Sequence, residues 1–303
     1  MGISRVEVER LMVFQNELAI DFCGSSYGGI NVLIGDNGSG KTTLLWSMYG
    51  YLNDTSQPPS GVSSKDMAEH YSTVGLKKMA YDQTENSNIA YIPEKDILEH
   101  AKGLLPFIEQ KQTGFSHIYR NVLIAAQDVP TKEQTEMQKS IAQQIIDITD
   151  GTVEWNQAYG SFHMAKTDGT RILFAHEASA YKKLGFLGLL VSSGQIKPGT
   201  ILFWDEPENS LNLELIPKLV DILQELAKNE VQIFIATHSY DIVRYLDIRK
   251  NKDIPVLFHY LSKQKPGQIT CSSSSKYTKL PDNHLERAGE DLFEAVIADS
   301  MGV

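Results

Sequence analysis

The sharpest chemical motif in the sequence spans residues 35–42. It consists of Gly35, Asp36, Asn37, Gly38, Ser39, Gly40, Lys41 and Thr42, in the pattern GxxxxGK[ST]. The glycines of this pattern let backbone N–H groups curl around a phosphate at the positive end of a helix. We expect Lys41 to reach the β- and γ-phosphate oxygens, the Thr42 hydroxyl to ligate Mg²⁺, and Thr43 to lie in the same binding segment. The motif therefore predicts a nucleoside triphosphate site, with a simple tight turn as the alternative.

A pair of carboxylates follows the apolar run 201–204. Asp205 and Glu206 stand at the end of a predicted strand, where open α/β sheets bind their ligands. We expect Asp205 to belong to a Mg²⁺ shell and Glu206 to polarise an attacking water. An acidic pair at a strand end is equally common in a solvated turn, so this assignment depends on the phosphate motif.

His238 ends a third apolar run, at residues 233–236 and Thr237. It lies about one strand-helix-strand crossover beyond Glu206, which places it on a neighbouring strand tip if the sheet has the usual order. A single histidine in this position is more often structural. Because the other two motifs are also present, we favour a catalytic position for His238 beside the γ-phosphate.

A mostly parallel sheet is needed to bring these motifs together. The predicted strands are 30–34, 201–204 and 232–236, and the predicted helices are 42–51, 179–191 and 213–228. Apolar residues that alternate between 6 and 22 predict further strands at the N-terminus. We therefore expect an α/β fold, a P-loop NTPase with a mostly parallel sheet, an antiparallel N-terminal subdomain and a small helical lobe.

Other segments give weaker signals. These are a strand at 87–92, a partly helical stretch at 94–112 interrupted by Gly103 and Pro106, a helix within 131–149, and a hairpin around Asp168-Gly169. Residues 53–87 look like a loop-rich insertion, and the serines at 272–275 look like a surface turn. Residues 286–301 predict a final amphipathic helix, which we expect to close the fold, with docking of a partner as the alternative.

Composition and charge restrict the location and the ligands that the chain can have. The hydrophobic fraction is 42%, the net charge is −10 and the isoelectric point is about 5.3, so the chain as a whole repels polyanions. Nucleic-acid binding would need a local basic patch. The two cysteines are far apart, and neither a signal-like N-terminus nor a long apolar run is present. These features predict a cytoplasmic protein that does not enter a membrane.

Together the motifs resemble the ABC-type ATPases of the SMC/RecF-like branch. The resemblance is closer to the stand-alone AAA-domain ATPases of prokaryotic defence loci, namely the overcoming-lysogenization-defect, AbiEii-associated and Septu PtuA proteins. It follows most of the chain in order: the strand-rich start, the phosphate loop, YIPEKDIL, a degenerate signature, LFWDEPENSLN and IATHS. The resemblance implies ATP and Mg²⁺ as ligands, Asp205 as metal ligand, Lys41 and Glu206 as catalytic residues, and His238 as a γ-phosphate switch. It also implies that residues 208–212 lie at a dimer interface.

Two elements depart from the family pattern. The signature stretch at 177–184 lacks both of its glycines, and Ala178 and Ser179 stand where the serine and the first glycine belong. We include Ser179 among the predicted nucleotide contacts, made to the opposite subunit, with an ordinary helix N-cap as the alternative. No Gln-loop is evident, so Glu94 or Lys95 would take over its contact.

The expected organisation is one ABC-type ATPase domain over residues 1–303. It divides into N-terminal strands and phosphate loop (1–52), an insertion with a helical signature lobe (53–195), and a half with the carboxylate pair, the histidine and the final helix (196–303). The chain between the motifs is too short for long coiled-coil arms.

The resemblance implies an ATP-hydrolysing regulatory ATPase that forms a head-to-tail homodimer or a higher homo-oligomer. It further implies the sensor or control subunit of an antiphage defence system, acting through a separately encoded nuclease or toxin, with nucleic acid left open as a ligand. Two alternatives remain. One is a RecF-like repair or recombination ATPase that binds DNA, and the other is a nucleotide-gated scaffold with little turnover.

Overall fold

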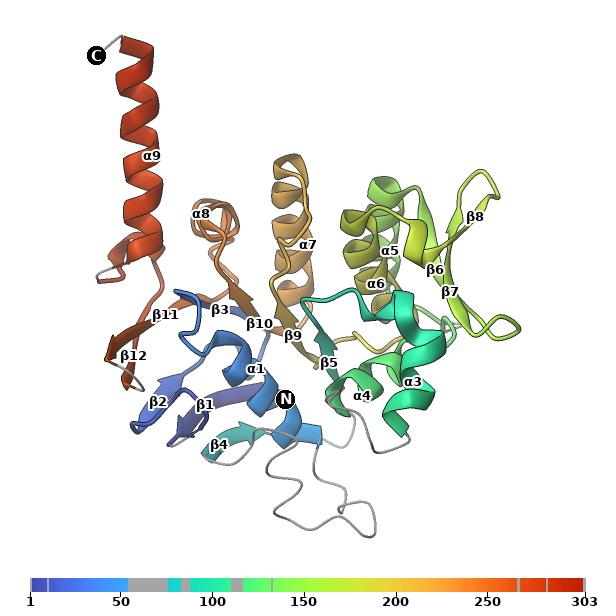
Figure 1. Cartoon of the computed structure of the whole chain (residues 1–303), viewed down its shortest axis with the longest axis horizontal. Helices are drawn as coiled ribbons and strands as arrows, with labels where there is room; N and C mark the ends of the chain where they lie inside the picture. Colours follow the sequence, from blue (N-terminus) through green and yellow to red (C-terminus); the bar gives the residue numbers. More distant parts are fainter. Residues whose placement is uncertain are drawn as a thin grey trace.

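A six-stranded sheet forms the centre of the fold (Figure 1). The computed structural model describes residues 2–9, 11–53, 76–82, 88–109, 117–131, 133–265, 268–281 and 283–301. The strands lie in the order β12-β11-β3-β10-β9-β5, and β12 alone runs antiparallel to its neighbour. Their bounds are β3 Gly29–Gly35, β5 Ile89–Ile92, β9 Ile201–Asp205, β10 Gln232–Thr237, β11 Val256–Lys265 and β12 Gln268–Ser274.

The three central strands are apolar along their whole length because both faces of the sheet are covered. Every residue of β3, β9 and β10 is buried. β10 lies between β3 and β9, with Thr237 opposite Ile34 and Ala236 opposite Asp205. This order confirms the strand assignments and places the three motif-bearing strand ends next to one another.

A second sheet, antiparallel throughout, confirms the expected N-terminal subdomain. It has the order β2-β1-β4, with β1 at Gly2–Val8, β2 at Leu18–Asp21 and β4 at Leu76–Asp82. Most of the predicted insertion at 53–87 lies outside the described residues. The described part corrects the expectation of a loop, because β4 extends the N-terminal sheet there.

Helices cover the central sheet. Those nearest the motifs are α1 (Lys41–Asn53), α7 (Ile216–Lys228, after the short 3₁₀ helix η3 at Leu213–Leu215) and α8 (Tyr240–Arg249). The second residue of α7 is Pro217, which suits the first turn of a helix because no N–H partner is needed there. α8 is capped by the Ser239 side chain, which accepts from the N–H of Ile242.

The lobe on the other side of β5 combines helices with a third sheet (Figure 1). Its elements are η1 Ile97–His100, α3 Ala101–Glu109, α4 His117–Ala125, α5 Glu136–Thr149, β6 Gly151–Asn156, β7 Ser161–Lys166, β8 Arg171–Leu173, η2 Phe174–His176 and α6 Ser179–Ser192. The hairpin at Asp168-Gly169 is confirmed, and β6 extends it to three strands. Gly103 and Pro106 do not interrupt the helical stretch, since both lie within α3.

The C-terminal part corrects two expectations. Ser272, Ser273 and Ser274 belong to the edge strand β12 rather than to a turn. After η4 (Tyr277–Lys279), the last helix, α9 (His284–Met301), projects away from the remainder of the molecule instead of closing the fold (Figure 1). Within the described residues, no helix is both long and apolar enough to cross a membrane.

Candidate nucleotide-binding site

The predicted functional residues converge at one edge of the central sheet. The phosphate loop follows β3, His238 follows β10, Asp205 ends β9, and Glu94 lies just beyond β5. Because these strands are parallel neighbours, their carboxyl ends lie side by side. The sheet order therefore assembles the site that the spacing along the chain predicted.

The phosphate loop adopts a conformation that depends on glycine at specific positions. Gly38 and Gly40 have φ angles of 77° and 94°, in the left-handed region. A Cβ atom at Gly40 would lie 2.5 Å from the ring of Phe14. Ser39 is fully buried, and its hydroxyl has no hydrogen-bond partner among the described residues. The loop thus presents a free donor and the start of α1, which together suit a phosphate group.

Lys41 lies folded back over the loop. It is buried, and its Nζ donates to the carbonyl oxygens of Gly35 at 2.7 Å and Asp36 at 3.2 Å. Burial lowers the pKa of Lys41, and the nearby carboxylates of Glu206 and Asp205 oppose that shift. The ammonium is therefore held beside the loop by weak acceptors that a phosphate oxygen can replace.

Thr42 and Asp205 are the two residues predicted to hold Mg²⁺, and they are in contact. The Thr42 hydroxyl donates to Asp205 Oδ1 over 3.1 Å. Burial raises the pKa of Asp205 to about 6, and the Thr42 hydrogen bond opposes this. A hydroxyl and a carboxylate oxygen are ligands that suit Mg²⁺, and a cation would satisfy the buried charge. The pair fits the ion on its donor chemistry.

Glu206 is held in a strained backbone conformation. Its φ angle is 47°, in the left-handed region that non-glycine residues avoid at a cost of about 1–2 kcal/mol. Two hydrogen bonds fix this conformation: its N–H donates to Ala236 O at 2.8 Å, and its carbonyl accepts from Lys183 Nζ at 3.1 Å. In this geometry Glu206 Oε1 lies 3.0 Å from His238 Nδ1. The predicted catalytic carboxylate and histidine are thus direct partners.

Glu208 organises the loop that carries His238. Its Oε1 accepts from the Thr237 hydroxyl and from the backbone N–H groups of His238 and Ser239, the latter two at 3.2 Å. The resemblance assigned this residue to a loop at a dimer interface. In the structure it also ties the two motif-bearing loops of one chain together, which sequence spacing alone did not indicate.

Ser179 does not approach the phosphate loop of its own chain. It is exposed at the start of α6. Ala178, not Ser179, occupies the N-cap position, and it makes no side-chain capping bond, so the N-cap alternative for Ser179 is wrong. Its contact with the nucleotide of a second copy stays a prediction.

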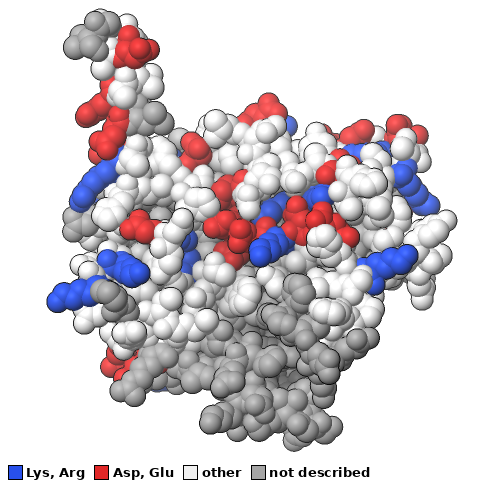
Figure 2. All heavy atoms as spheres, in the orientation of Figure 1, with Lys and Arg blue, Asp and Glu red and all other residues white. Residues whose placement is uncertain are grey.

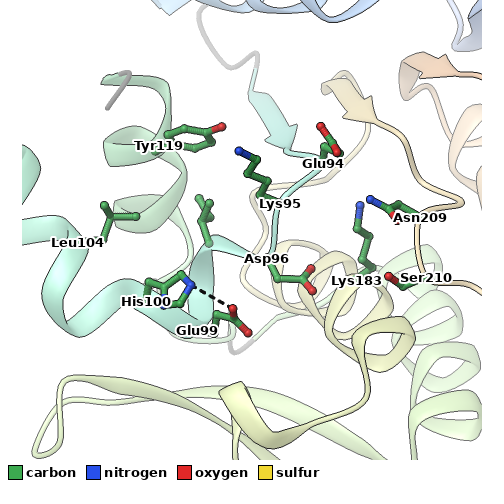
Figure 3. A pocket seen from close by; sticks show the side chains of 11 residues that line it. Glu94, Lys95, Asp96, Glu99, His100, Leu104, Tyr119, Lys183, Asn209 and Ser210 are labelled. Carbon is green, nitrogen blue, oxygen red and sulfur yellow. Dashed lines mark ion pairs between the residues drawn. The ribbon is translucent and has the colours of Figure 1, made fainter. Parts of the chain in front are cut away.

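Glu94 and Lys95 line a cleft of about 470 Å³ next to the carboxylate pair (Figure 3). Lys183 of α6 and the exposed Asn209 and Ser210 form its other side. Burial lowers the pKa of Lys183, and Asp96 and Glu208 are among the carboxylates that oppose the shift. The negative charge of Glu94 also helps to raise the pKa of Asp205. Whether Glu94 or Lys95 takes over the Gln-loop contact stays a prediction.

Two further contacts escaped sequence reasoning. Lys183 reaches the Glu206 carbonyl from α6, and His284 Nδ1 of α9 lies 3.1 Å from Asp36 Oδ2 in the phosphate loop. Each joins residues more than twenty positions apart. Lys183 lies in the degenerate signature stretch and His284 belongs to no motif, so only the packing of the helices could reveal these two contacts.

The fold is an α/β P-loop NTPase fold similar to that of SMC heads. An SMC head bound to the C-terminal winged-helix domain of ScpA is similar at a TM-score of 0.56 and 14% identity, covering 92% of this chain and 99% of that one. A second similar structure is an SMC head from Pyrococcus furiosus with an extended coiled coil, bound to the C-terminal domain of ScpA. Its TM-score is 0.51 and its sequence identity is 13%, and the match covers 97% of this chain and 99% of that one. No match is found among curated proteins.

Residues 69–244 match the family described as "AAA domain, putative AbiEii toxin, Type IV TA system", and the chain belongs to this family. Membership implies ATP binding. The matched range contains Asp205, Glu206 and His238, whereas the phosphate loop precedes it. The loop is therefore supported independently, by its own motif and by its position beside the matched strands.

Proposed function

We propose that this chain is an ATP-hydrolysing regulatory ATPase that works as one domain over residues 1–303. The observation that carries the proposal is the pair of contacts at neighbouring strand ends. Thr42 Oγ1 lies 3.1 Å from Asp205 Oδ1, and Glu206 Oε1 lies 3.0 Å from His238 Nδ1. A loop that only turned the chain would not need both pairs beside a buried lysine.

The phosphate loop would bind ATP through the backbone N–H groups of residues 35–42 and through Lys41. Lys41 would exchange its carbonyl acceptors for the β- and γ-phosphate oxygens. Thr42 and Asp205 would hold Mg²⁺, which neutralises charge on the phosphates when bound. Thr43 lies in the first turn of α1, within the same binding segment.

Glu206 would accept a proton from the water that attacks the γ-phosphorus, while the bond to the β-phosphate oxygen breaks and ADP leaves. His238 would contact the γ-phosphate and orient the Glu206 carboxylate, with which it shares a hydrogen bond. Glu208 would keep His238 in position through the three bonds to its loop. Lys41 would stabilise the charge that develops on the phosphoryl oxygens.

A head-to-tail homodimer, or a higher homo-oligomer, would complete the site with the Ser179 region of a second copy. The exposed start of α6 supports this arrangement, because helix N-termini attract anions. The resemblance of the motifs to ABC-type ATPases, which implies a head-to-tail dimer, supports it too. Without signature glycines the approach to the γ-phosphate would be less close.

In the cell, the chain would act as the control subunit of a prokaryotic antiphage defence system in the cytoplasm. The family description, which connects the domain with a toxin system, supports this role. A separately encoded nuclease or toxin would be the effector, and nucleic acid is one candidate trigger.

ATP turnover and sedimentation test the proposal together. Glu206→Gln should lower kcat by at least about 100-fold and accumulate an ATP-bound dimer, because the proton acceptor is lost and binding is kept. Lys41→Ala should lose nucleotide binding. The matched controls are Glu214→Gln and Lys139→Ala, which change exposed residues away from the site.

The alternatives give different results in the same assays. Turnover that rises with duplex DNA and falls steeply with salt would favour the RecF-like repair ATPase. ATP binding with wild-type turnover no greater than that of Glu206→Gln would overturn hydrolysis and favour the scaffold.

A further inference from the structure

Within the described part of the chain, α9 contacts the body of the protein at its base. Its 18 residues make a rod of about 27 Å, which extends beyond α8 and the edge strands (Figure 1). At the base, Leu285 packs against the core and a Cβ at Gly289 would lie 2.4 Å from the Tyr240 ring. Glu286 Oε1 lies 3.8 Å from the Arg244 guanidinium nitrogen Nη1 on α8. The base is therefore firmly seated, and the outer turns continue past the surface of the fold.

The outer turns expose large apolar side chains on one face. Phe293 is 66% exposed, Val296 57%, Ile297 37% and Met301 74%. Their spacing of three, one and four residues puts them on a single side of the helix. Gly289, one turn before Phe293, belongs to the side that packs on Tyr240. The face that is buried at the base is thus continued outward as an exposed apolar face.

The charges around this face are all of one sign. Between residues 288 and 301 the helix carries Glu290, Asp291, Glu294 and Asp299, and no lysine, arginine or histidine. Figure 2 shows acidic side chains along the projecting helix. A second copy of the helix would bring carboxylates against carboxylates, which is unfavourable. An anionic lipid surface would be repelled in the same way.

We propose that Phe293, Val296, Ile297 and Met301 form a docking surface for a different protein, whose binding site is apolar and bordered by lysine or arginine side chains. The exposed apolar face supplies the contact area, as in helix-in-groove recognition, and the surrounding carboxylates select a basic rim.

The base of the same helix contacts the phosphate loop. His284 Nδ1 lies 3.1 Å from Asp36 Oδ2, and the backbone N–H of His284 donates to the Tyr260 hydroxyl at 3.4 Å. Tyr260 lies on β11 directly opposite Ile34 of β3, which enters the loop. A shift of the loop would therefore reach α9. Docking does not depend on the proposed function, whereas its coupling to nucleotide rests on it.

The docking surface is tested with a labelled helical peptide of leucine and lysine, which offers an apolar face between basic side chains. Fluorescence anisotropy in 150 mM salt should show binding to the whole chain. Phe293→Ser with Val296→Ser should weaken it at least about tenfold, while Ala288→Ser with Ala295→Ser, two exposed positions on the opposite side of α9, should not. The same peptide with glutamate in place of lysine should bind at least about tenfold more weakly.

The proposal fails if the Phe293/Val296 double variant binds the lysine peptide as tightly as the wild type, if the wild type does not bind it, or if both peptides bind alike. Sedimentation supplies another decisive outcome. A wild-type dimer that this double variant dissociates would mean that a second copy occupies the surface, which would overturn the choice of partner. Circular dichroism should confirm that both double variants retain the wild-type fold.

The coupling is tested by repeating the titration with a slowly hydrolysed ATP analogue and Mg²⁺. The peptide affinity should change by at least about threefold, and His284→Ala should abolish the change. An unchanged response in His284→Ala would overturn the coupling. Direct binding of a fluorescent ATP analogue is measured in parallel, so that a failure to bind nucleotide is distinguished from a failure to couple.

Discussion

The nucleotide edge and the outer part of α9 are opposite kinds of surface. At the edge, Lys41, Asp205 and Glu206 are largely buried. Asp205 and Glu206 are hydrogen-bonded to residues far away in the sequence, and Lys41 is hydrogen-bonded to the phosphate loop itself. Beyond Gly289, α9 leaves the body and exposes Phe293 to solvent. At the edge, the phosphate loop, the carboxylate pair and His238 come together within one chain, whereas α9 presents an apolar face that the described residues do not cover.

The two surfaces also differ in how they affect stability. The edge holds groups in unfavourable states: Glu206 has a left-handed backbone, and burial raises the pKa of Asp205. Such features lower the stability of the fold and persist only where surrounding contacts fix them. Substitutions on the outer turns of α9 should change the free energy of unfolding little, because these side chains contribute little to the folded core. The edge is therefore marked by backbone strain at Glu206 and a buried carboxylate, and the outer part of α9 by exposed apolar side chains.

After Lys41 and Glu206, the largest effect is expected at Glu208. In Glu208→Ala, the Thr237 hydroxyl and the N–H groups of His238 and Ser239 lose their shared acceptor, so the histidine loop shifts. We expect kcat for ATP to fall about 10- to 100-fold with a smaller change in KM, because a displacement of the order of 1 Å has effects of this size. Steady-state turnover measures it.

The matched variant Glu208→Gln keeps an acceptor oxygen and should recover most of the activity, while Glu214→Ala should behave like the wild type. An inactive Glu208→Gln variant would mean that the negative charge, and not the hydrogen bonds to the loop, is what the site needs.

The three motifs and the strands that carry them were predictable because the geometry of a parallel sheet is strict. Consecutive buried runs such as 201–205 and 232–237, joined by a short crossover, usually form adjacent strands, and the ends of parallel neighbours then meet at one edge. Positions of Asp205 and His238 follow from that rule.

The remainder depended on packing that no local pattern records. β6 and β12 carry too many polar residues to stand out, since each has one solvated face or lies at a sheet edge. Pro106 is accommodated within α3 because the segment has tertiary neighbours. The contacts of Lys183 with Glu206 and of His284 with Asp36 depend on where whole helices lie. The projection of α9 could not be predicted either, because an amphipathic sequence does not show which part of the protein covers its apolar face.

An intermediate effect is expected at Asp205, where function and stability oppose one another. In Asp205→Asn the buried carboxylate is replaced by a neutral amide, so the free energy of unfolding at pH 7 should rise by on the order of 1–2 kcal/mol while Mg²⁺-dependent ATP binding is lost. Urea unfolding of both proteins at pH 5 and pH 7.5 measures the change.

The sign of the pH dependence follows from the raised pKa. The folded protein holds the Asp205 proton up to about pH 6, whereas the unfolded chain releases it near 3.8. This group therefore destabilises the fold above about pH 6 and ceases to do so as the pH falls toward 4. The difference between Asp205→Asn and the wild type should shrink at pH 5. A constant difference would show that the carboxylate is ionised throughout.

The smallest effect is expected at Phe293, and it marks where the folded core ends. Phe293→Ala should change the free energy of unfolding by less than about 0.5 kcal/mol, because the side chain is already two-thirds exposed. The matched substitution Phe234→Ala removes a fully buried ring from β10 and should cost about 3–5 kcal/mol. Urea unfolding of both variants gives the comparison directly. A cost above about 1 kcal/mol at Phe293 would mean that the outer turns of α9 are packed against the protein in solution, and the apolar face would then serve the fold instead of a partner.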